Sequence, residues 1–277
     1  MASCEKEYAP PGVTAGPGTP TNPGNNPLLL KLESSVQNSK ESTVIDYTYN
    51  AQKKIIKISR VDVDDNGKKT TIDYRYIRDA AGKISSIITN DPELYILGGI
   101  ASDSLVIKVN YPAGSFNFDY TTFSFKVGNL QYVDSSIFVY AAGTSRITEI
   151  FHSLNSVPVT IFTKSRFVYT NNNITQRKYL TIVQGNEVPT LTLNIEYGSK
   201  FAPLSVGNEG FLPGMDIDNV SVNDFKKYVM IDHSSNPSSV LATVNYTTLY
   251  NSYNLPGSTT VNVEGTNQMI KLKYTYQ

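Results

Sequence analysis

The chain has 277 residues, and its 24 Lys and Arg balance its 24 Asp and Glu, so the formal net charge is zero. A balanced charge argues against a nucleic-acid partner, because binding to phosphates depends on an excess of Lys and Arg. Only 17% of the residues are charged, 40% are hydrophobic and one is a cysteine, which excludes a disordered chain, a helical membrane protein and a disulfide scaffold.

The N-terminal segment contains the single cysteine, Cys4, directly after Ala2 and Ser3. Small residues before a cysteine are typical of the end of a bacterial lipobox, in which the cysteine receives lipid. No apolar signal stretch precedes Cys4, so we expect that a signal peptide was trimmed or that translation starts further upstream. Cys4 is therefore the predicted lipid-attachment residue, and the membrane is a predicted partner through this anchor.

Residues 9–27 form a Pro- and Gly-rich tract that has almost nothing apolar to bury. Prolines also remove backbone donors, so the tract predicts an extended, semi-flexible spacer. We expect residues 1–27 to hold the lipid-attachment cysteine and the tether, and residues 28–277 to form a single β-rich domain. A tether of this kind holds a domain off a membrane, which predicts an extracytoplasmic lipoprotein of a bacterial outer membrane, periplasmic or surface-exposed.

From Leu28 onward, short segments rich in β-branched and aromatic residues alternate between apolar and polar side chains, which predicts strands. Turn signals separate these segments. Two of them, Asp65–Lys68 and Gln184–Glu187, predict tight hairpins with positive φ at both central residues. The predicted strands are Thr43–Tyr49, Thr70–Tyr76, Ser104–Tyr111, Ser136–Tyr140, Arg166–Tyr169, Thr190–Tyr197, Ala242–Tyr246 and Met269–Tyr276.

Two segments predict short helices. In Ser221–Met230, Ser221 can cap the first turn, Asp224 follows within that turn, and Val222, Phe225 and Val229 share one helical face. Asp91–Ile100 predicts a second short turn of helix. The remainder of the sequence carries no helical pattern.

An internal repeat links the first strands. Thr-x-Ile-Asp-Tyr-x-Tyr occurs in Thr43–Tyr49 and again, 27 residues later, in Thr70–Tyr76. A period of about 28 residues accommodates one hairpin. We therefore expect an all-β fold: an antiparallel meander of about eight to fourteen strands that forms an open or closed barrel-like sheet, with one or two short helices. Each copy is followed by an Ile-x-x-Ile pair, Ile55 and Ile58 and then Ile84 and Ile87.

The chain combines a lipobox-like cysteine and a spacer with hairpins that consist of an aromatic-x-Tyr strand, a polar turn and an Ile-x-x-Ile strand. This arrangement resembles a Bacteroidetes-type family of outer-membrane lipoproteins. That family has a porin-like fold and no known function. The resemblance covers residues 28–277. It implies an antiparallel, barrel-like sheet and lipid anchoring, and it assigns no activity and no functional residue.

The sharpest motif for a metal begins at Asp62. Asp62, Asp64, Asn66 and Asp73 fall at positions 1, 3, 5 and 12 of a calcium loop, with Gly67 at the bend. Calcium prefers several oxygen ligands on alternate residues of a tight loop. The competing interpretation, which we favour, is a solvated hairpin tip, because strand patterns flank the motif. Apart from calcium, no cofactor is expected.

Catalytic signals are weak, so no catalytic residue is assigned and the chain is interpreted as a binding protein rather than an enzyme. Asp232, His233 and Ser234 are adjacent in sequence, and adjacent residues cannot form a catalytic relay. We expect binding or scaffolding at the outer membrane, with a glycan, a peptide or a protein as partner. Two alternatives remain open: a secreted, glycan-active hydrolase with a carboxylate pair assembled by the fold, and a calcium-stabilised structural module.

Overall fold

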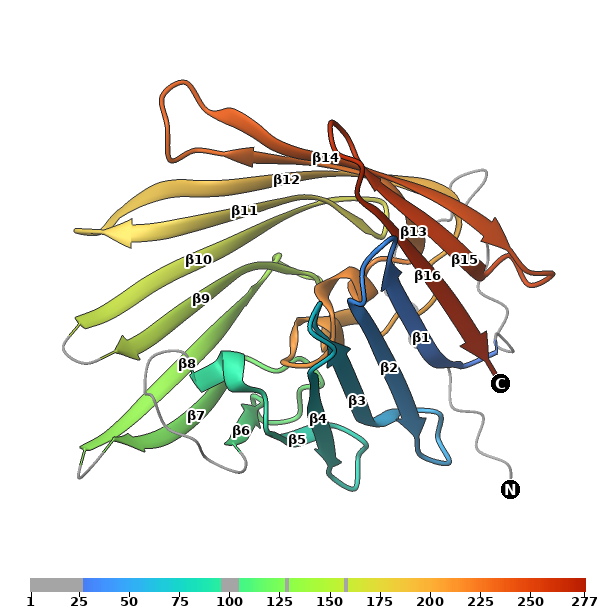
Figure 1. The fold of residues 1–277 in the computed structure, drawn as a ribbon. Coiled ribbons are helices and arrows are strands. Elements are labelled where there is room, and N and C mark those ends of the chain that lie inside the picture. The colour runs from blue at the N-terminus through green and yellow to red at the C-terminus, as the bar shows by residue number, and fades with distance from the viewer. Residues whose placement is uncertain (1–26, 96–104, 128–129, 157–158) are drawn as a thin grey trace.

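A computed structural model of the chain describes residues 27–95, 105–127, 130–156 and 159–277. Sixteen antiparallel strands form one closed barrel in which each strand pairs with its neighbours in sequence and β16 pairs with β1 (Figure 1). The strands are β1 (Leu29–Val36), β2 (Ser42–Tyr49), β3 (Ile55–Val63), β4 (Lys69–Arg78), β5 (Ile84–Thr89), β6 (Leu105–Asn110), β7 (Tyr120–Val127), β8 (Leu130–Tyr140), β9 (Ile147–Ser156), β10 (Val159–Thr170), β11 (Asn173–Val183), β12 (Asn186–Phe201), β13 (Asn223–Asp232), β14 (Ser239–Tyr250), β15 (Pro256–Val263) and β16 (Met269–Tyr276). Three short 3₁₀ helices lie in the connections: η1 (Pro92–Tyr95), η2 (Gly207–Phe211) and η3 (Ile217–Val220).

This architecture confirms the predicted all-β antiparallel meander, and the sheet closes. Sixteen strands exceed the predicted eight to fourteen, because the later hairpins do not carry the clear motif from which the number was estimated. Closure gives every strand two hydrogen-bonded neighbours and removes the exposed edges that an open meander would leave.

The helix predicted over Ser221–Met230 is wrong, because Asn223–Asp232 is strand β13, paired with β12 and β14. Sheet pairing on both sides overrides a weak local helical pattern. The Ser221 hydroxyl does not cap a helix; it accepts the Ile174 N–H and bonds the Tyr197 hydroxyl. The second predicted helix begins with the single turn η1, and residues 96–104 lie outside the described residues.

The two predicted tight turns differ from each other. At Asp65–Lys68, only Gly67 has positive φ, and the turn is a longer loop in which the Asp64 carboxylate accepts the N–H groups of Asn66 and Lys68. The other turn has positive φ at both central residues, as expected, but these are Gln184 and Gly185, one position earlier than predicted.

Each Ile-x-x-Ile pair is produced by a one-residue β-bulge. Along a regular strand, residues two apart share a face, so residues three apart cannot both face inward. In β3, Tyr49 pairs with Ile55 and Thr48 with Lys57, so Ile56 is an extra residue and both Ile55 and Ile58 are buried. A bulge also increases the local twist of the sheet. Corresponding extra residues are Leu30 in β1, Ser85 in β5, Thr148 in β9, Thr175 in β11 and Gly257 in β15.

Tyrosines of the next strand satisfy the backbone at these bulges. The Tyr169 hydroxyl, for example, donates to the carbonyl of Ile147, the first residue of the β9 bulge. Burial raises the pKa of Tyr197 to about 12, so its hydroxyl keeps its proton at neutral pH. At the bulges, the tyrosine–carbonyl bonds are Tyr49 to Leu29, Tyr169 to Ile147, Tyr197 to Ile174 and Tyr276 to Pro256, at 2.7–2.9 Å. Tyr140 makes a similar bond of 2.6 Å to the carbonyl of Phe118, in the connection before β7.

The long connection between β12 and β13, residues 202–222, folds into the barrel and is here called the plug (Figure 1). Its side chains Leu212, Met215 and Val220 belong to the buried core, together with the isoleucines of the bulges. Because consecutive strands alternate in direction, the plug enters at the same end as the bulged turns and the start of β1. We call this the plug end and the other the far end.

Replacing Tyr169 by Phe should destabilise the barrel by about 1–2 kcal/mol, because the Ile147 carbonyl loses its hydroxyl donor. The matched control is Tyr253→Phe, at an exposed tyrosine whose hydroxyl makes no hydrogen bond within the described part of the chain. Thermal melting should show a decrease of about 2–4 °C for the first variant and no change for the control. Equal melting temperatures for both variants would contradict this role of the tyrosines.

Candidate functional site

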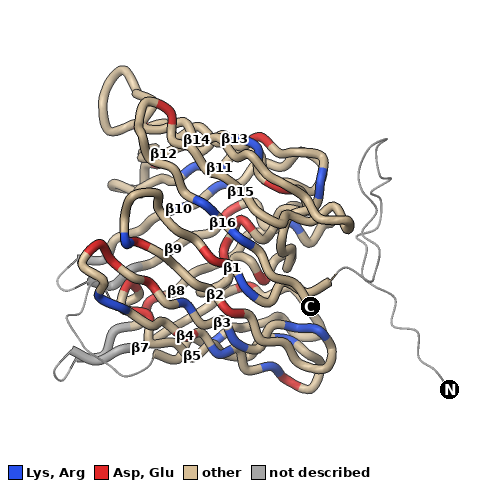
Figure 2. Tube along the Cα trace, turned by 45° about the vertical axis from the view of Figure 1, so that its right-hand side comes forward, with Lys and Arg blue, Asp and Glu red and all other residues tan. Residues whose placement is uncertain are grey.

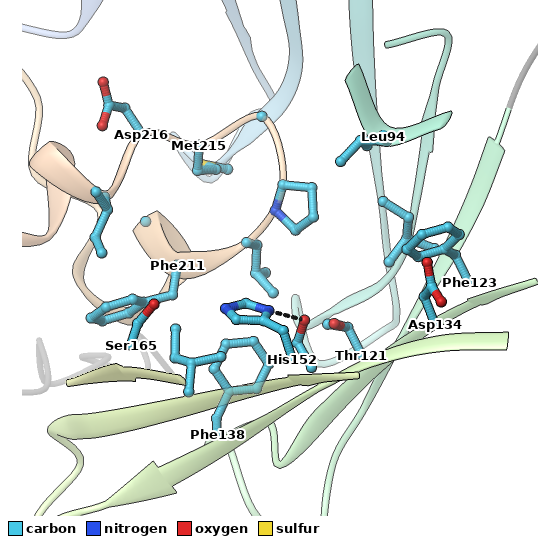
Figure 3. Close-up of a pocket in the computed structure, with 18 of the residues that line it drawn as sticks. Leu94, Thr121, Phe123, Asp134, Phe138, His152, Ser165, Phe211, Met215 and Asp216 are labelled. Atoms are coloured by element: carbon cyan, nitrogen blue, oxygen red, sulfur yellow. Dashed lines mark hydrogen bonds between the residues drawn. The ribbon is translucent and has the colours of Figure 1, made fainter. Parts of the chain in front are cut away.

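The barrel interior holds a cavity of about 660 Å³ between the plug and the inner faces of β4 and β6–β11. Its walls are mainly apolar and include Phe138, Phe167 and, from the plug, Phe211 (Figure 3). Glu93 of η1 and Ile161 at the start of β10 also line it, and both segments belong to the far end, so the cavity extends away from the plug end. This volume lies within the range of sites that bind small molecules.

A hydrogen-bonded pair of side chains faces this cavity. The Ser136 hydroxyl of β8 lies 2.8 Å from Nδ1 of His152 on β9, and the two residues are direct partners across the sheet. Burial lowers the pKa of His152, so the imidazole is neutral at neutral pH. The pair therefore brings uncharged hydrogen-bonding groups to a mainly apolar cavity.

Arg78 attaches the plug to the barrel wall. Its guanidinium binds both carboxylate oxygens of Glu209, at 2.7 and 2.8 Å. It also donates to the carbonyls of Ile55 and Gly82. Arg78 pairs with Ile84 at the bulge of β5. In the preceding hairpin, Tyr49 pairs with Ile55 at the bulge of β3, so Arg78 occupies the strand position that a tyrosine holds there. Arg78 therefore makes both the hydrogen bond to a bulge carbonyl, that of Ile55, and the ion pair with Glu209 of the plug.

A second ion pair, between Arg177 of β11 and Asp218 of η3, attaches the plug to another part of the wall. Burial alone would lower the pKa of Arg177, but the charge and hydrogen bond of Asp218 outweigh it and the pKa is raised. Nearby, Asp216 caps η3 by accepting the N–H of Asp218. Desolvation, followed by the charge of Asp218, raises the pKa of Asp216 to about 6. The plug is therefore fixed by charged groups on two sides.

The four predicted calcium ligands do not converge. Asp62 accepts from Thr43 and Arg60, and Asp64 is occupied by the N–H groups of its own loop. Asp73 is held by Ser59 and Lys57. Asp73 lies between the inward-facing Ile72 and Tyr74, so it projects outward, whereas Asp62 shares the face of Ile58.

Asp62 and Asp64 line a shallow depression of about 330 Å³, and Asn66 and Asp73 are not part of it. The described residues contain no group of three or more His, Cys, Asp or Glu arranged to hold a metal ion. The loop connects β3 and β4, with the Asp64 N–H donating to the Lys68 carbonyl. Binding of calcium by Asp62, Asp64, Asn66 and Asp73 stays a prediction.

Other candidate residues are dispersed. The Asp232 carboxylate accepts a hydrogen bond from the Ser234 hydroxyl. His233 is hydrogen-bonded to Thr192 on the neighbouring strand instead, so Asp232, His233 and Ser234 do not form a catalytic relay. Among the cavity carboxylates, Asp134 and Asp216 lie on opposite sides of the view in Figure 3. The carboxylate pair of the hydrolase alternative is therefore not formed by these two residues. Cys4 lies outside the described residues.

The outer wall carries charged pairs in the middle of the sheet. Lys164 and Arg166 flank the cavity-lining Ser165, so they project outward, and both bind Glu149 and Glu187 at 2.5–3.4 Å. Figure 2 shows Lys, Arg, Asp and Glu along the strands around the barrel and not only at the turns. A membrane-spanning barrel presents an uninterrupted apolar band to lipid. The described strands have no such band around their whole circumference.

Sequence reasoning missed the plug and the cavity. The plug has no periodic pattern, and its position depends on contacts with Arg78 and Arg177, which lie far away in sequence. A signal was present for the cavity wall: Asp134, Ser136 and Phe138 alternate along one strand and all line the cavity. Alternation alone cannot tell a filled interior from a hollow one.

Replacing Arg78 by Ala should destabilise the protein by about 3–5 kcal/mol, because Glu209 would be left half-buried without its charge partner. Glu209→Gln should have a smaller effect, because Arg78 would keep its bonds to the carbonyls of Ile55 and Gly82. Urea unfolding of the two variants measures both losses. A larger loss for Glu209→Gln than for Arg78→Ala would contradict the assignment of Arg78 as the anchor.

The described part of the chain contains no helix with the length and apolar character needed to cross a membrane. No family model matches the chain, and no curated protein matches it either. Among solved structures, it is similar to a porin-like protein from Bacteroides uniformis ATCC 8492, with a TM-score of 0.53, 11% identity and coverage of 90% of this chain and 98% of that chain. A porin-like protein from Bacteroides vulgatus ATCC 8482 also gives a TM-score of 0.53 and 11% identity, over 91% of this chain and 99% of that one. At this identity, the comparisons establish a shared barrel fold.

Proposed function

We propose that this chain is a lipid-anchored extracytoplasmic barrel that binds a small, largely apolar ligand between its plug and its inner wall. The observation that carries the proposal is the mainly apolar cavity of about 660 Å³, lined by seven strands and the plug. Apolar cavities with a few polar groups are typical of small-molecule binding sites. Burial of apolar ligand surface would supply most of the affinity.

The construction of the plug supports binding rather than passage. Leu212, Met215 and Val220 are packed into the buried core. Two ion pairs, Arg78–Glu209 and Arg177–Asp218, fix the plug to the wall. A barrel occupied in this way at one end can retain a molecule that enters from the far end.

The charged groups in the middle of the outer wall support a barrel that stands in water on a tether, rather than one embedded in lipid. Placing unpaired charges opposite lipid costs about 2–4 kcal/mol each at the middle of a membrane. The ion cluster of Glu149, Lys164, Arg166 and Glu187 would have to be desolvated there. Attachment through lipid on Cys4, with residues 9–27 as spacer, requires no apolar wall.

The geometry favours an apolar small molecule over the other partners considered. A glycan needs many hydrogen-bonding groups, whereas the lining of this cavity is mainly apolar. Tyrosine rings can also stack on sugars, but several tyrosines of this barrel donate their hydroxyls to backbone carbonyls, as Tyr49 and Tyr169 do. A peptide or protein partner would have to use the outer surface, for which the cavity offers no argument.

The purified full-length chain should bind N-phenyl-1-naphthylamine, an uncharged apolar fluorophore, with an increase in fluorescence. Ser165→Phe should weaken this binding at least tenfold, because the new ring projects from the cavity wall into the space of the ligand. Ser135→Phe is the matched control: Ser135 is adjacent to the cavity-lining Ser136 and faces outward. Failure of the wild-type chain to bind the probe, or equal effects of the two substitutions, would refute interior binding.

The anchor has a separate test. When the chain is exported from a signal supplied upstream in a Bacteroides host, metabolic labelling with palmitate should mark it and place it in the membrane fraction. Cys4→Ser should lose the label and release the protein, whereas Ser3→Ala should retain both. Labelling that survives Cys4→Ser would overturn the assignment of Cys4.

A further inference from the structure

Three uncharged hydrogen-bonding side chains of the cavity lie together on one wall. Thr121 of β7 pairs with Ser136 of β8, and Ser136 pairs with His152 of β9, so the three occupy one row across adjacent strands. All three line the cavity. In Figure 3, Thr121 and His152 lie near each other, and the dashed line marks the Ser136–His152 hydrogen bond. We call Thr121, Ser136 and His152 the polar row.

The plug contributes an apolar surface to the same cavity. Phe211, Leu212 and Met215 line it from the plug, and Leu212 and Met215 are almost fully buried. A molecule lying between plug and wall would therefore meet the polar row on one side and the apolar side chains of Phe211, Leu212 and Met215 on the other. This asymmetry fits a ligand with one polar group on an apolar body.

His152 has one ring nitrogen available. Nδ1 contacts the Ser136 hydroxyl at 2.8 Å, and within the described part of the chain Nε2 makes no hydrogen bond. In neutral histidine, one ring nitrogen carries the proton and the other accepts a hydrogen bond. If the Ser136 hydroxyl donates to Nδ1, then Nε2 carries the N–H; if the hydroxyl accepts from Nδ1, then Nε2 is the acceptor. A ligand hydroxyl is the group that satisfies both forms.

The charges around the cavity disfavour an anionic ligand. Its described lining includes the acidic residues Glu93, Asp134 and Asp216 and contains no Lys or Arg. A carboxylate placed there would lose its hydration without meeting an opposite charge. A neutral polar group avoids this cost.

From these contacts we infer that the polar row recognises the hydroxyl of a neutral, long-chain or polycyclic alcohol, whose hydrocarbon body packs against the plug. The inference rests on the proposed function, since it names the ligand class of the same cavity. The Nε2 atom of His152 makes the specific contact, and Ser136 orients the ring.

The test compares ligands of one chain length. 1-Decanol, decanoate and decylamine are titrated against the N-phenyl-1-naphthylamine complex of the full-length chain. Decanol should displace the probe at a concentration at least tenfold lower than decanoate, and decylamine should not displace it at a lower concentration than decanol. His152→Phe keeps a ring of similar size and removes the hydrogen bond, so it should weaken decanol binding about five- to tenfold. Ser136→Ala should weaken it about two- to fivefold.

The affinity of each variant for the probe shows whether the cavity is retained. His233→Phe is the matched control for His152→Phe, because His233 is hydrogen-bonded to Thr192 and neither residue lines the cavity. Decanol binding that is unchanged in both His152→Phe and Ser136→Ala would overturn the inference while leaving interior binding intact. Tighter binding of decanoate or decylamine than of decanol would overturn it as well. Absence of probe binding to the wild-type chain would refute the proposed function instead.

Discussion

The bulge at the plug end of five hairpins is the constraint on which the rest of this structure depends. One extra residue turns two side chains, three positions apart, toward the interior, and in β3, β5 and β9 both of these are isoleucines. A tyrosine hydroxyl from the following strand donates to the carbonyl of the first bulge residue at Ile147, Ile174 and Pro256, and likewise at Leu29 in the bulge of β1. The buried backbone is thereby paired, as a closed barrel requires. Recurrence of this arrangement around the barrel gives the plug end a dense apolar core.

The plug depends on the same arrangement. In β4, an arginine takes the place of the tyrosine, and Arg78 binds both the bulge carbonyl of Ile55 and the plug residue Glu209. Leu212 and Met215 of the plug then pack on the core that the bulges create. Because the plug fills only one part of the interior, a cavity is left between it and β6–β11. The candidate site is therefore a consequence of how one end of the barrel is closed.

Much of the fold could be predicted from the sequence, and the site could not. Alternation and the recurring tyrosines identified the all-β meander, because they reflect contacts between neighbouring strands. The helix predicted over Ser221–Met230 is wrong, because a helical pattern in ten residues stabilises a helix less than sheet pairing with β12 and β14 stabilises a strand. The spacing of Asp62 and Asp73 fits a calcium loop in sequence, yet a strand directs them to opposite faces. His152 and Ser136 meet only through strand register, and the plug is fixed by arginines 41 and 131 residues away.

A crystal structure of the protein with a brominated long-chain alcohol tests the central claim most directly, because the anomalous signal of bromine locates the ligand without reference to the side chains. The account predicts one bromine peak inside the barrel, between the plug and β6–β11, with the hydroxyl next to His152. A peak only on the outer wall, or a cavity filled by rearranged side chains of the plug, would contradict it.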